Sequence, residues 1–321
     1  MDKLAEAKKV FDIEIEALKK TRDALDEAFV EILDSVTSCK GKVIITGMGK
    51  PGHIGTKIAA TLASLGTPSF YLHPGEAMHG DLGMVTKDDI VIMISYSGES
   101  DEIVRIIPNI KMIGAKLIAI TGNPNSTLAQ SADLSQIFPK FEEACYLGLA
   151  PTSSTTVTLC YGDALAVVAS GVYGYTKSDY GKRHPAGSLG KKLILRVQDL
   201  MAKGDNTPKV ILGTSLMNTI EEMSKKGLGI VTIVDREGRL CGILTDGDLR
   251  RVLERRVDIY SEIVDDVMIR TPYTVDAETL AVDALVLIRS KSINSLPVID
   301  KDNKVVGAIT WQNIVKAGIV I

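Results

Sequence analysis

The sequence predicts an α/β protein: a parallel five-stranded sheet flanked by helices, followed by a C-terminal α+β module made of two similar repeats. Two observations predict this organisation. Between residues 42 and 138, short apolar runs alternate with amphipathic stretches, which is typical of parallel strands covered by helices on both faces. After residue 196, short segments recur in the same order at a nearly constant spacing.

The first module is expected to begin with a helical segment at residues 3–38, because its apolar positions recur at helical spacing between charges. Further helices are expected over 54–65, over 102–113 and from 156 onward. Strands are expected over 43–46, 69–72, 90–95, 116–121 and 134–138. In a parallel sheet of this kind, ligands bind at the carboxyl ends of the strands, where the Gly- and Ser-rich segments of this chain fall.

The second module is predicted from an internal repeat. VQDLM at 197–201 resembles VDDVM at 264–268, TIVD at 232–235 resembles PVID at 297–300, and GILT at 242–245 resembles GAIT at 307–310. The offsets are 67, 65 and 65 residues. Each copy is expected to bury its apolar face against the other. The expected domains are therefore 1–196, 197–257 and 258–321.

Composition excludes several classes of protein. The 321 residues carry a net charge of −3, and the N-terminal helical segment is more acidic than basic, which argues against nucleic-acid binding. No apolar signal segment follows Met1, and the apolar stretch at 156–175 carries Asp163, which favours a buried core helix over a membrane span. The four cysteines form no CxxC pair and are expected to be reduced. We therefore expect a cytoplasmic protein.

A Ser- and Gly-rich turn, SYSGES at residues 95–100, joins the third strand to a helix. Hydroxyls and backbone N–H groups there can surround an anion, and the helix N-terminus adds a positive dipole end. The same residues also fit an ordinary strand–helix turn with a Ser N-cap. These residues alone leave both interpretations open.

Other polar segments lie at similar places. In GMGKPG at residues 47–52, Lys50 can meet a phosphate or a developing oxyanion, or stay in solvent; the turn is neither a Walker A nor a dinucleotide fingerprint. All four histidines precede residue 196, and their spacing fits no standard zinc pattern, so no metal is expected. PTSSTT at 151–156 opens the long helix and can cap it or line a polyol site.

Together, GMGKPGHIG, HPGEAMHGDLGMV, SYSGES, ITGNP, LGLAPTSSTT, HPAGSLG and GILTDGDLRR, in this order, resemble the D-arabinose 5-phosphate isomerases. Members of that family consist of a sugar isomerase (SIS) domain followed by two CBS repeats, and the resemblance covers nearly the whole chain. It implies an aldose–ketose isomerase that interconverts D-ribulose 5-phosphate and D-arabinose 5-phosphate through an enediolate, with no required cofactor. It also implies a homo-oligomer, expected to be a tetramer, and a role in 3-deoxy-D-manno-octulosonate or capsule synthesis.

The resemblance implies four catalytic positions, which here hold Lys50, His79, Glu102 and His184. Glu102 is expected to be the carbon base and His184 the acid or ring-opening group, although these two roles can be exchanged. Lys50 would stabilise the developing oxyanion, and His79 would hold hydroxyls or relay a proton. His184 is expected to reach a neighbouring subunit's site.

The resemblance also implies the groups that hold the substrate. The family's phosphate cradle corresponds to Ser95, Ser97 and Ser100, with Gly49 in the neighbouring turn. The hydroxyl run supplies candidates for lining the sugar, namely Ser153, Ser154 and Thr155.

Three positions depart from the family pattern. Pro51 stands where Ser is usual, Tyr96 where a smaller polar residue is usual, and Tyr146 where Pro is usual. Proline fits the first turn of a helix, although it removes an N–H from the turn. We expect these changes to alter substrate affinity or sugar preference and to leave the reaction type intact.

CBS pairs often bind adenosine nucleotides through a Thr and an Asp three residues apart. Thr245 and Asp248 fit this pattern, whereas the second repeat pairs Thr310 with Asn313, which lacks the carboxylate charge. At most one competent site is therefore expected, around Asp248, for an adenosine nucleotide or a nucleotide-activated sugar. The alternative is a repeat pair that only joins subunits.

Two other functions remain open for the whole chain. One is a non-catalytic sugar-phosphate sensor, and the other is a ketol isomerase acting on a different phosphosugar. The acidic N-terminal segment and the presence of all four catalytic positions argue against the sensor. The HPAGSLG segment and the repeat pair favour the arabinose family over other ketol isomerases.

Overall fold

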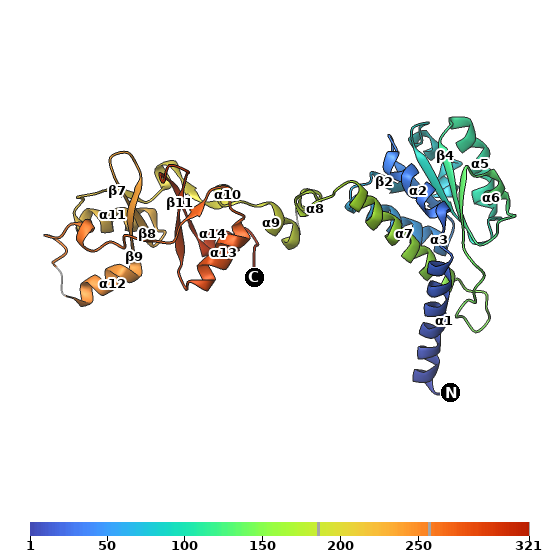
Figure 1. The fold of residues 1–321 in the computed structure, drawn as a ribbon, viewed down its shortest axis with the longest axis horizontal. Helices are drawn as coiled ribbons and strands as arrows, with labels where there is room; N and C mark the ends of the chain where they lie inside the picture. Colours follow the sequence, from blue (N-terminus) through green and yellow to red (C-terminus); the bar gives the residue numbers. More distant parts are fainter. Residues whose placement is uncertain (185–186, 256–257, 321) are drawn as a thin grey trace. The chain divides into compact units, whose positions relative to one another are not determined.

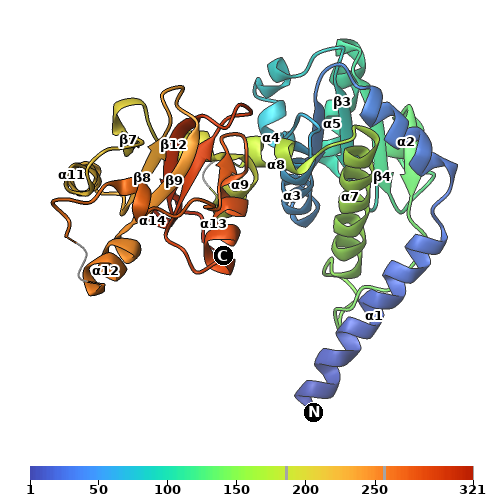
Figure 2. The same cartoon turned by 60° about the vertical axis from the view of Figure 1, so that its left-hand side comes forward.

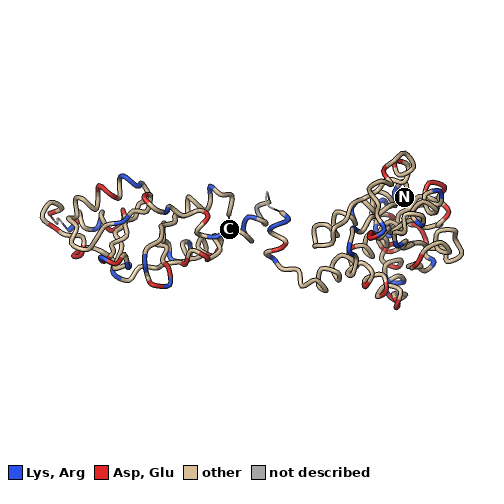
Figure 3. The backbone as a smooth tube through the Cα atoms, turned by 90° about the horizontal axis from the view of Figure 1, so that it is seen from above, with Lys and Arg blue, Asp and Glu red and all other residues tan. Residues whose placement is uncertain are grey.

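The computed structural model describes residues 1–184, 187–255 and 258–320. The chain separates into two compact units, Met1–Thr176 and Lys177–Ile321. Figure 3 shows acidic and basic positions interspersed along the described chain in both units. The division of the chain places the segment from Lys177 onward, which includes His184, in the second unit.

The first unit is a layered α/β domain (Figure 1). Its parallel sheet has the strand order β2-β1-β3-β4-β5, which confirms the predicted five-stranded sheet. The strands are β1 (Val43–Gly47), β2 (Ser69–Tyr71), β3 (Ile90–Ile94), β4 (Lys116–Thr121) and β5 (Leu134–Ile137). The helices are α1 (Lys3–Asp23), α2 (Glu27–Ser38), α3 (Lys50–Ser64), α4 (Pro74–Ala77), η1 (Asp81–Met84), α5 (Asp101–Ile113), α6 (Thr127–Ser131) and α7 (Ser153–Val172).

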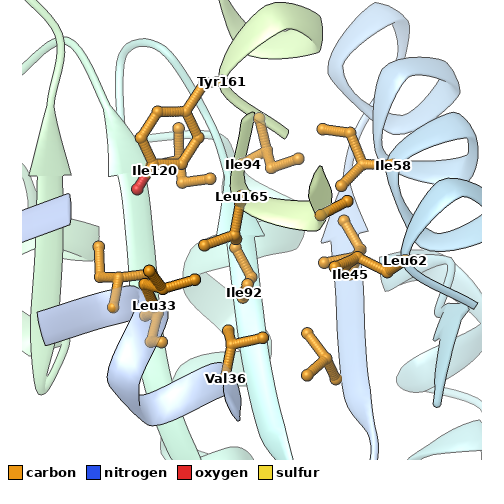
Figure 4. Packing of buried hydrophobic residues seen from close by; sticks show 14 of the residues in the cluster. Leu33, Val36, Ile45, Ile58, Leu62, Ile92, Ile94, Ile120, Tyr161 and Leu165 are labelled. Atoms are coloured by element: carbon orange, nitrogen blue, oxygen red, sulfur yellow. The ribbon is translucent and has the colours of Figure 1, made fainter. Parts of the chain in front are cut away.

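Alternation along the strands divides the core between the two faces of the sheet. Ile45, Ile92 and Ile94 pack toward α1, α2, α3 and α7, and Figure 4 shows this cluster with Tyr161 and Leu165 of α7. The alternate residues, including Ile44 and Met93, pack toward α4, α5 and α6. Burial of one such side chain stabilises the fold by about 1.5–3 kcal/mol, so both faces hold the sheet firmly.

Two differences from the predicted helices have a clear local cause. Residues 3–38 form two helices, because the Asp26 side chain accepts a hydrogen bond from the backbone N–H of Ala28 and starts a new helix there. Helix α3 begins at Lys50, four residues before the predicted start, because Gly49 has a φ of 65° and turns the chain sharply into the helix.

Helix α7 is, in the described chain, the one helix long and apolar enough to cross a membrane by length and composition. Its buried residues Val157, Tyr161 and Leu165 belong to the core of the first unit. Gly162 lets α7 approach α3 closely, since a Cβ there would lie 2.4 Å from the Ile58 side chain. The helix therefore behaves as the core helix predicted from the sequence.

The second unit contains two sheets, one of order β7-β8-β9 and one of order β10-β11-β12-β6. Its strands are β6 (Ala202–Lys203), β7 (Lys209–Ile211), β8 (Ile230–Val234), β9 (Leu240–Thr245), β10 (Val275–Asp276), β11 (Ser295–Ile299) and β12 (Val305–Thr310). Its helices are α8 (Lys177–Arg183), α9 (Ser188–Ile194), α10 (Val197–Leu200), η2 (Gly204–Asn206), α11 (Leu216–Lys226), α12 (Asp246–Glu254), η3 (Val264–Asp266), α13 (Ala281–Ser290) and α14 (Trp311–Lys316). Helices α13 and α14 lie together in Figure 2.

The two halves of this unit have the same architecture, strand–helix–strand–strand–helix, which confirms the predicted duplication and adds a leading strand to each copy. Each contains an antiparallel strand pair with a register shift, at Ile233/Val234 in one half and at Val298/Ile299 in the other. The halves also exchange their lead-in segments. β6, which lies near the start of the first repeat, pairs with β12 of the second, and Ile269, which lies near the start of the second repeat, bridges to Ile243 of the first. The duplication is therefore structural as well as sequential.

Candidate active site

The carboxyl edge of the first sheet gathers polar side chains from neighbouring strands. Lys50 follows β1, His79 follows β2, and the Ser95–Ser100 turn follows β3. These strands are adjacent in the order β2-β1-β3, and the chain runs from β1 to β2 on one side and then crosses back to β3 on the other side of β1. Such a reversal opens a crevice at the ends of the strands where ligands bind. The predicted residues therefore lie at the place where this type of sheet forms a site.

The Ser-rich turn is tightly organised. Ser95 is buried, and its Oγ lies 3.0 Å from the Ser100 Oγ and accepts a hydrogen bond from the backbone N–H of Gly98 at 3.1 Å. Ser97 is exposed, and its Oγ accepts from the N–H of Glu99 at 3.3 Å. The three predicted serines thus belong to one turn, in which Ser95 makes internal hydrogen bonds and Ser97 is exposed to solvent.

Gly98 is required in this turn. Its φ is 69°, and a Cβ would lie 2.1 Å from the Ser126 Oγ. Ser100 is the N-cap of α5, yet its hydroxyl bonds to Ser95 and not to its own helix. The first turn of this 13-residue helix therefore receives no side-chain cap from Ser100, which suits a helix that meets an external anion.

Two predicted catalytic groups flank that turn. Glu102 occupies the first turn of α5 and is half-buried. Lys50 is the first residue of α3 and is exposed, beside Gly49 at the N-cap and Pro51 in the first turn. The cation and the carboxylate therefore start the two helices that follow the adjacent strands β1 and β3.

His79 lies in the connection after β2, between α4 and η1, and is exposed. Its backbone N–H donates to the carbonyl of Glu76 at 2.9 Å. Within the described chain, no three His, Cys, Asp or Glu side chains come together as ligands for a metal ion.

Glu143 is a carboxylate at this edge that the sequence analysis missed. It lies in the connection from β5 to α7, and its Oε2 accepts from the Thr152 N–H at 2.6 Å, the Thr152 Oγ1 at 2.9 Å and the Ser154 N–H at 3.3 Å. Burial alone would raise its pKa, but hydrogen bonds from Ser154 and Thr152 outweigh burial and lower the pKa of Glu143. The only sequence signal was a carboxylate in a loop before a hydroxyl-rich helix start.

The hydroxyl run that opens α7 is partly committed to structure. Ser153 and Ser154 are buried, and the Thr155 Oγ1 donates to the carbonyl of Thr152 at 2.7 Å. The Ser153 Oγ has no hydrogen-bond partner among the described residues. Ser154 and Thr155 border a small cavity that is also lined by Pro51 and Tyr96.

His184 belongs to the second unit, whereas Lys50, His79 and Glu102 belong to the first. It directly follows α8, and its Nδ1 lies 2.9 Å from the carbonyl oxygen of Tyr180. The structure thus brings three of the four predicted catalytic residues to one edge of one unit and holds the fourth in the other unit.

A separate cleft of about 550 Å³ lies in the second unit, between its two repeats. Thr245 and Asp248 line it from the first repeat, and Thr310 and Trp311 from the second. Asp248 caps α12: its Oδ2 accepts from the Thr245 Oγ1 at 2.6 Å and the Thr245 N–H at 3.0 Å, and its Oδ1 pairs with Arg251.

The second repeat reproduces this cap without the charge. The Oδ1 of Asn313 accepts from the Thr310 Oγ1 at 2.6 Å and from the Thr310 N–H at 3.1 Å. The two caps are therefore alike in hydrogen-bond geometry and differ in charge.

Comparison with known proteins agrees with this architecture. Residues 37–168 match the SIS domain family, and residues 197–255 and 264–319 match the CBS domain family. Arabinose 5-phosphate isomerase KdsD of Pseudomonas aeruginosa is 46% identical over 319 residues, which cover 99% of this chain and 98% of that protein. KdsD of Escherichia coli is 47% identical over 313 residues, covering 98% and 95%.

The chain belongs to the arabinose 5-phosphate isomerase family. The predicted family, its SIS fold and its tandem CBS repeats are thereby confirmed.

Solved structures of relatives cover the SIS part of this family member. An Escherichia coli protein in complex with A5P is 46% identical, with a TM-score of 0.56, and the match covers 57% of this chain and 98% of that chain. A Bacteroides fragilis putative phosphosugar isomerase involved in capsule formation is 36% identical, with a TM-score of 0.54, covering 56% and 96%.

The three departures from the family pattern occupy distinct places. Pro51 and Tyr96 line the same small cavity at the carboxyl edge of the sheet. Tyr146 lies in the connection from β5 to α7, is 79% exposed, and directs its Oη toward Glu6 of α1 at 3.3 Å. Two of the departures are therefore close to the proposed site and one is on the surface.

Proposed function

We propose that this protein interconverts D-ribulose 5-phosphate and D-arabinose 5-phosphate at the carboxyl edge of its SIS sheet. The observation that carries the proposal is the placement of Lys50, the Ser95–Ser100 turn and Glu102 at the starts of α3 and α5, on adjacent strands at the switch point of the sheet. Family membership supplies the substrate class, because the KdsD relatives are named as arabinose 5-phosphate isomerases.

The reaction requires three kinds of group. A base removes a proton from C1 of the open-chain ketose while the C2 oxygen gains one, which gives an enediol. Loss of the O1 proton and return of a proton to C2 then give the aldose. In this proposal Glu102 is the carbon base, His184 moves protons between the oxygens or opens the ring, Lys50 stabilises negative charge on the oxygens, and His79 holds hydroxyls.

The phosphate would bind the Ser-rich turn. The exposed Ser97, the turn backbone and the N-terminus of α5 supply hydrogen-bond donors and a positive dipole end, and Ser95 braces the turn from inside. Gly49 would let the neighbouring turn approach the phosphate, and Ser153, Ser154 and Thr155 would lie beyond the sugar. Remote phosphate binding then positions C1 and C2 against Glu102.

We further propose that the active enzyme is a homo-oligomer, and specifically a tetramer, in which His184 reaches the site of a neighbouring subunit. His184 belongs to a different compact unit from the other three groups, and the family resemblance assigns it to a neighbouring subunit's site. Helix α7 carries three exposed apolar side chains that support an additional interface between subunits, namely Val167, Val168 and Val172. A cytoplasmic location and a role in 3-deoxy-D-manno-octulosonate or capsule synthesis complete the proposal.

The cleft between the CBS repeats is proposed to hold one adenosine nucleotide or nucleotide-activated sugar, centred on Asp248. Its volume of about 550 Å³ is within the range of ligand sites, and Asp248 supplies a buried carboxylate to one side only. A ligand there would regulate and not take part in catalysis.

Incubation of the protein with ribulose 5-phosphate, followed by identification of the aldose formed, tests the main proposal. Appearance of arabinose 5-phosphate is the expected result. Tight binding without turnover would support the sensor function, and a different aldose would support a different ketol isomerase.

A further inference from the structure

The connection between β5 and α7, residues 138–152, carries Glu143 to the carboxyl edge of the sheet; we call it the β5–α7 loop. Helix α7 depends on this loop at its start. Its N-cap, Thr152, makes no side-chain bond to its own helix, and Glu143 instead accepts from the N–H groups of Thr152 and Ser154. The N–H of Ala144 donates to the Thr152 Oγ1 at 2.8 Å and closes the loop on the helix.

A ring contact joins this loop to the Ser-rich turn. Phe141, two residues before Glu143, packs against Tyr96 with ring centroids 5.2 Å apart and planes inclined at 41°. Tyr96 stands between Ser95 and Ser97, so the ring that holds the loop belongs to the turn proposed to bind phosphate. Aromatic contacts of this kind add about 0.5–1.5 kcal/mol beyond their buried area.

The Tyr96 backbone and ring are themselves fixed by the end of β4. The carbonyl oxygen of Tyr96 accepts from the N–H of Gly122 at 2.9 Å and from the Thr121 Oγ1 at 3.1 Å. Gly122 makes room for the ring, since a Cβ there would lie 2.7 Å from it. Tyr96 is therefore held in place by β4, whereas the loop beyond Phe141 carries exposed side chains such as Tyr146, Leu147 and Leu149.

The electrostatic environment agrees with this proximity. Burial is the main cause that raises the pKa of Tyr96, and the negative charge of Glu143 raises it further. The phenol therefore stays protonated at neutral pH, and it is close enough to Glu143 to sense its charge.

We propose that Tyr96 is a positioning residue: by packing on Phe141 it holds the β5–α7 loop in place, so that Glu143 stays on the N-terminus of α7 at the edge of the site. A small polar side chain at position 96 could not make this ring contact. The structural part is independent of the proposed isomerase function, and only its effect on turnover rests on that function.

Hydrogen exchange in the region 144–156 tests the structural part. In Tyr96→Ala, the amides of Ala144, Thr152 and Ser154 should exchange faster by about tenfold, because loss of about 1.4 kcal/mol opens the loop ten times more often. Tyr96→Phe keeps the ring and loses only the hydrogen bond between the phenol oxygen and the Phe141 backbone, so its exchange should rise less than that of Tyr96→Ala. Phe141→Leu should resemble Tyr96→Ala, and adding Tyr96→Ala to Glu143→Gln should cause no further increase.

Phe70→Ala is the matched control, because Phe70 is a half-buried aromatic residue on the opposite face of the sheet. It should lower the melting temperature without changing exchange at 144–156. Unchanged exchange in folded Tyr96→Ala, or an equal increase in Phe70→Ala, would overturn the proposal.

Steady-state kinetics test the consequence for the site. Tyr96→Ala should lower kcat by at least about fivefold and Tyr96→Phe by less, because Phe keeps the ring contact with Phe141. If wild-type protein turns over no ribulose 5-phosphate while the exchange pattern is as expected, the proposed function fails and the positioning role stands. If the wild type is active and Tyr96→Ala keeps full kcat, the link to the site is wrong.

Discussion

His184 lies face to face with Tyr180, with ring centroids 4.0 Å apart and planes inclined at only 15°. The carbonyl oxygen of Tyr180 lies 2.9 Å from the Nδ1 of His184, and a carbonyl can only accept a hydrogen bond. In the neutral ring Nδ1 therefore carries the proton and Nε2 is the basic nitrogen. The stacking on Tyr180 and this hydrogen bond together fix the orientation of the imidazole, so that Nε2 is the nitrogen that can accept a proton.

Mixed oligomers test whether His184 acts on a neighbouring subunit. Inactive Glu102→Gln chains combined with inactive His184→Ala chains should regain activity, because some sites then draw both intact groups from different chains. The measurement is isomerase activity in oligomers purified with two different tags. Mixed oligomers that contain both chains and show no activity would place His184 in its own chain's site or outside catalysis.

Glu102→Gln should lower turnover by at least about a hundredfold, or about 2.7 kcal/mol of barrier, because the amide keeps the shape of the side chain and cannot accept the carbon-bound proton. Asp101→Asn is the matched control, since Asp101 is the adjacent carboxylate and pairs with Arg105 on the helix surface. Exchange of the substrate's carbon-bound proton in deuterated water identifies the base directly. Exchange that persists in Glu102→Gln would transfer the role to His184.

The two caps of the CBS cleft allow a reciprocal experiment. Asp248→Asn should abolish nucleotide binding without unfolding the repeat, because Asn313 makes the same cap geometry in the second repeat. Asn313→Asp should create a second carboxylate site and tighten binding by about tenfold, or add a second binding event. Emission of Trp311, which lines the cleft, reports AMP binding. If AMP titrations give the same binding curve for wild type and Asp248→Asn, Asp248 does not contribute to nucleotide binding in the cleft.

The burial and hydrogen bonds of the Asp89 carboxylate predict how the free energy of unfolding depends on pH. It is 2% exposed, and its carboxylate accepts from the Lys42 N–H at 2.6 Å and the Thr86 N–H at 2.7 Å. Burial would raise its pKa, but these hydrogen bonds outweigh burial and lower the pKa of Asp89. Because the folded-state pKa lies below the unfolded value, the stabilisation is complete above that value, about 3.9, and is lost as pH falls through the folded-state pKa.

Asp89→Asn should therefore lower the free energy of unfolding at neutral pH by about 1–3 kcal/mol and flatten its fall between about pH 5 and pH 2. Asp88→Asn, at the exposed neighbouring position, should do neither. Denaturant titrations at several pH values provide the measurement. If the free energy of unfolding depends on pH in the same way for wild type and Asp89→Asn, Asp89 has the same pKa in the folded and unfolded states.

The sheet could be predicted because its strands are nearly continuous apolar runs, and the repeat because its landmarks recur along the chain. The break between α1 and α2 at Asp26 could not be predicted, because one long helix and two consecutive helices show the same apolar spacing. The structure distinguishes them through the hydrogen bond from the N–H of Ala28 to the Asp26 side chain. Glu143 was missed for a related reason. Thr152 looks like a complete N-cap in sequence, and only tertiary structure shows that a carboxylate from the preceding loop completes the cap.

The exchange of lead-in segments between the CBS repeats has a consequence for how this module arose and how it can be divided. β6 completes the second repeat's sheet and Ile269 bridges to the first repeat, so a chain cut between the repeats would leave each piece lacking a strand partner that only the other piece carries. The pieces should be poorly soluble when expressed separately and should reassemble when expressed together. A single ancestral repeat would have faced the same incomplete edge, and pairing with its own copy would have solved it before the two were joined in one chain.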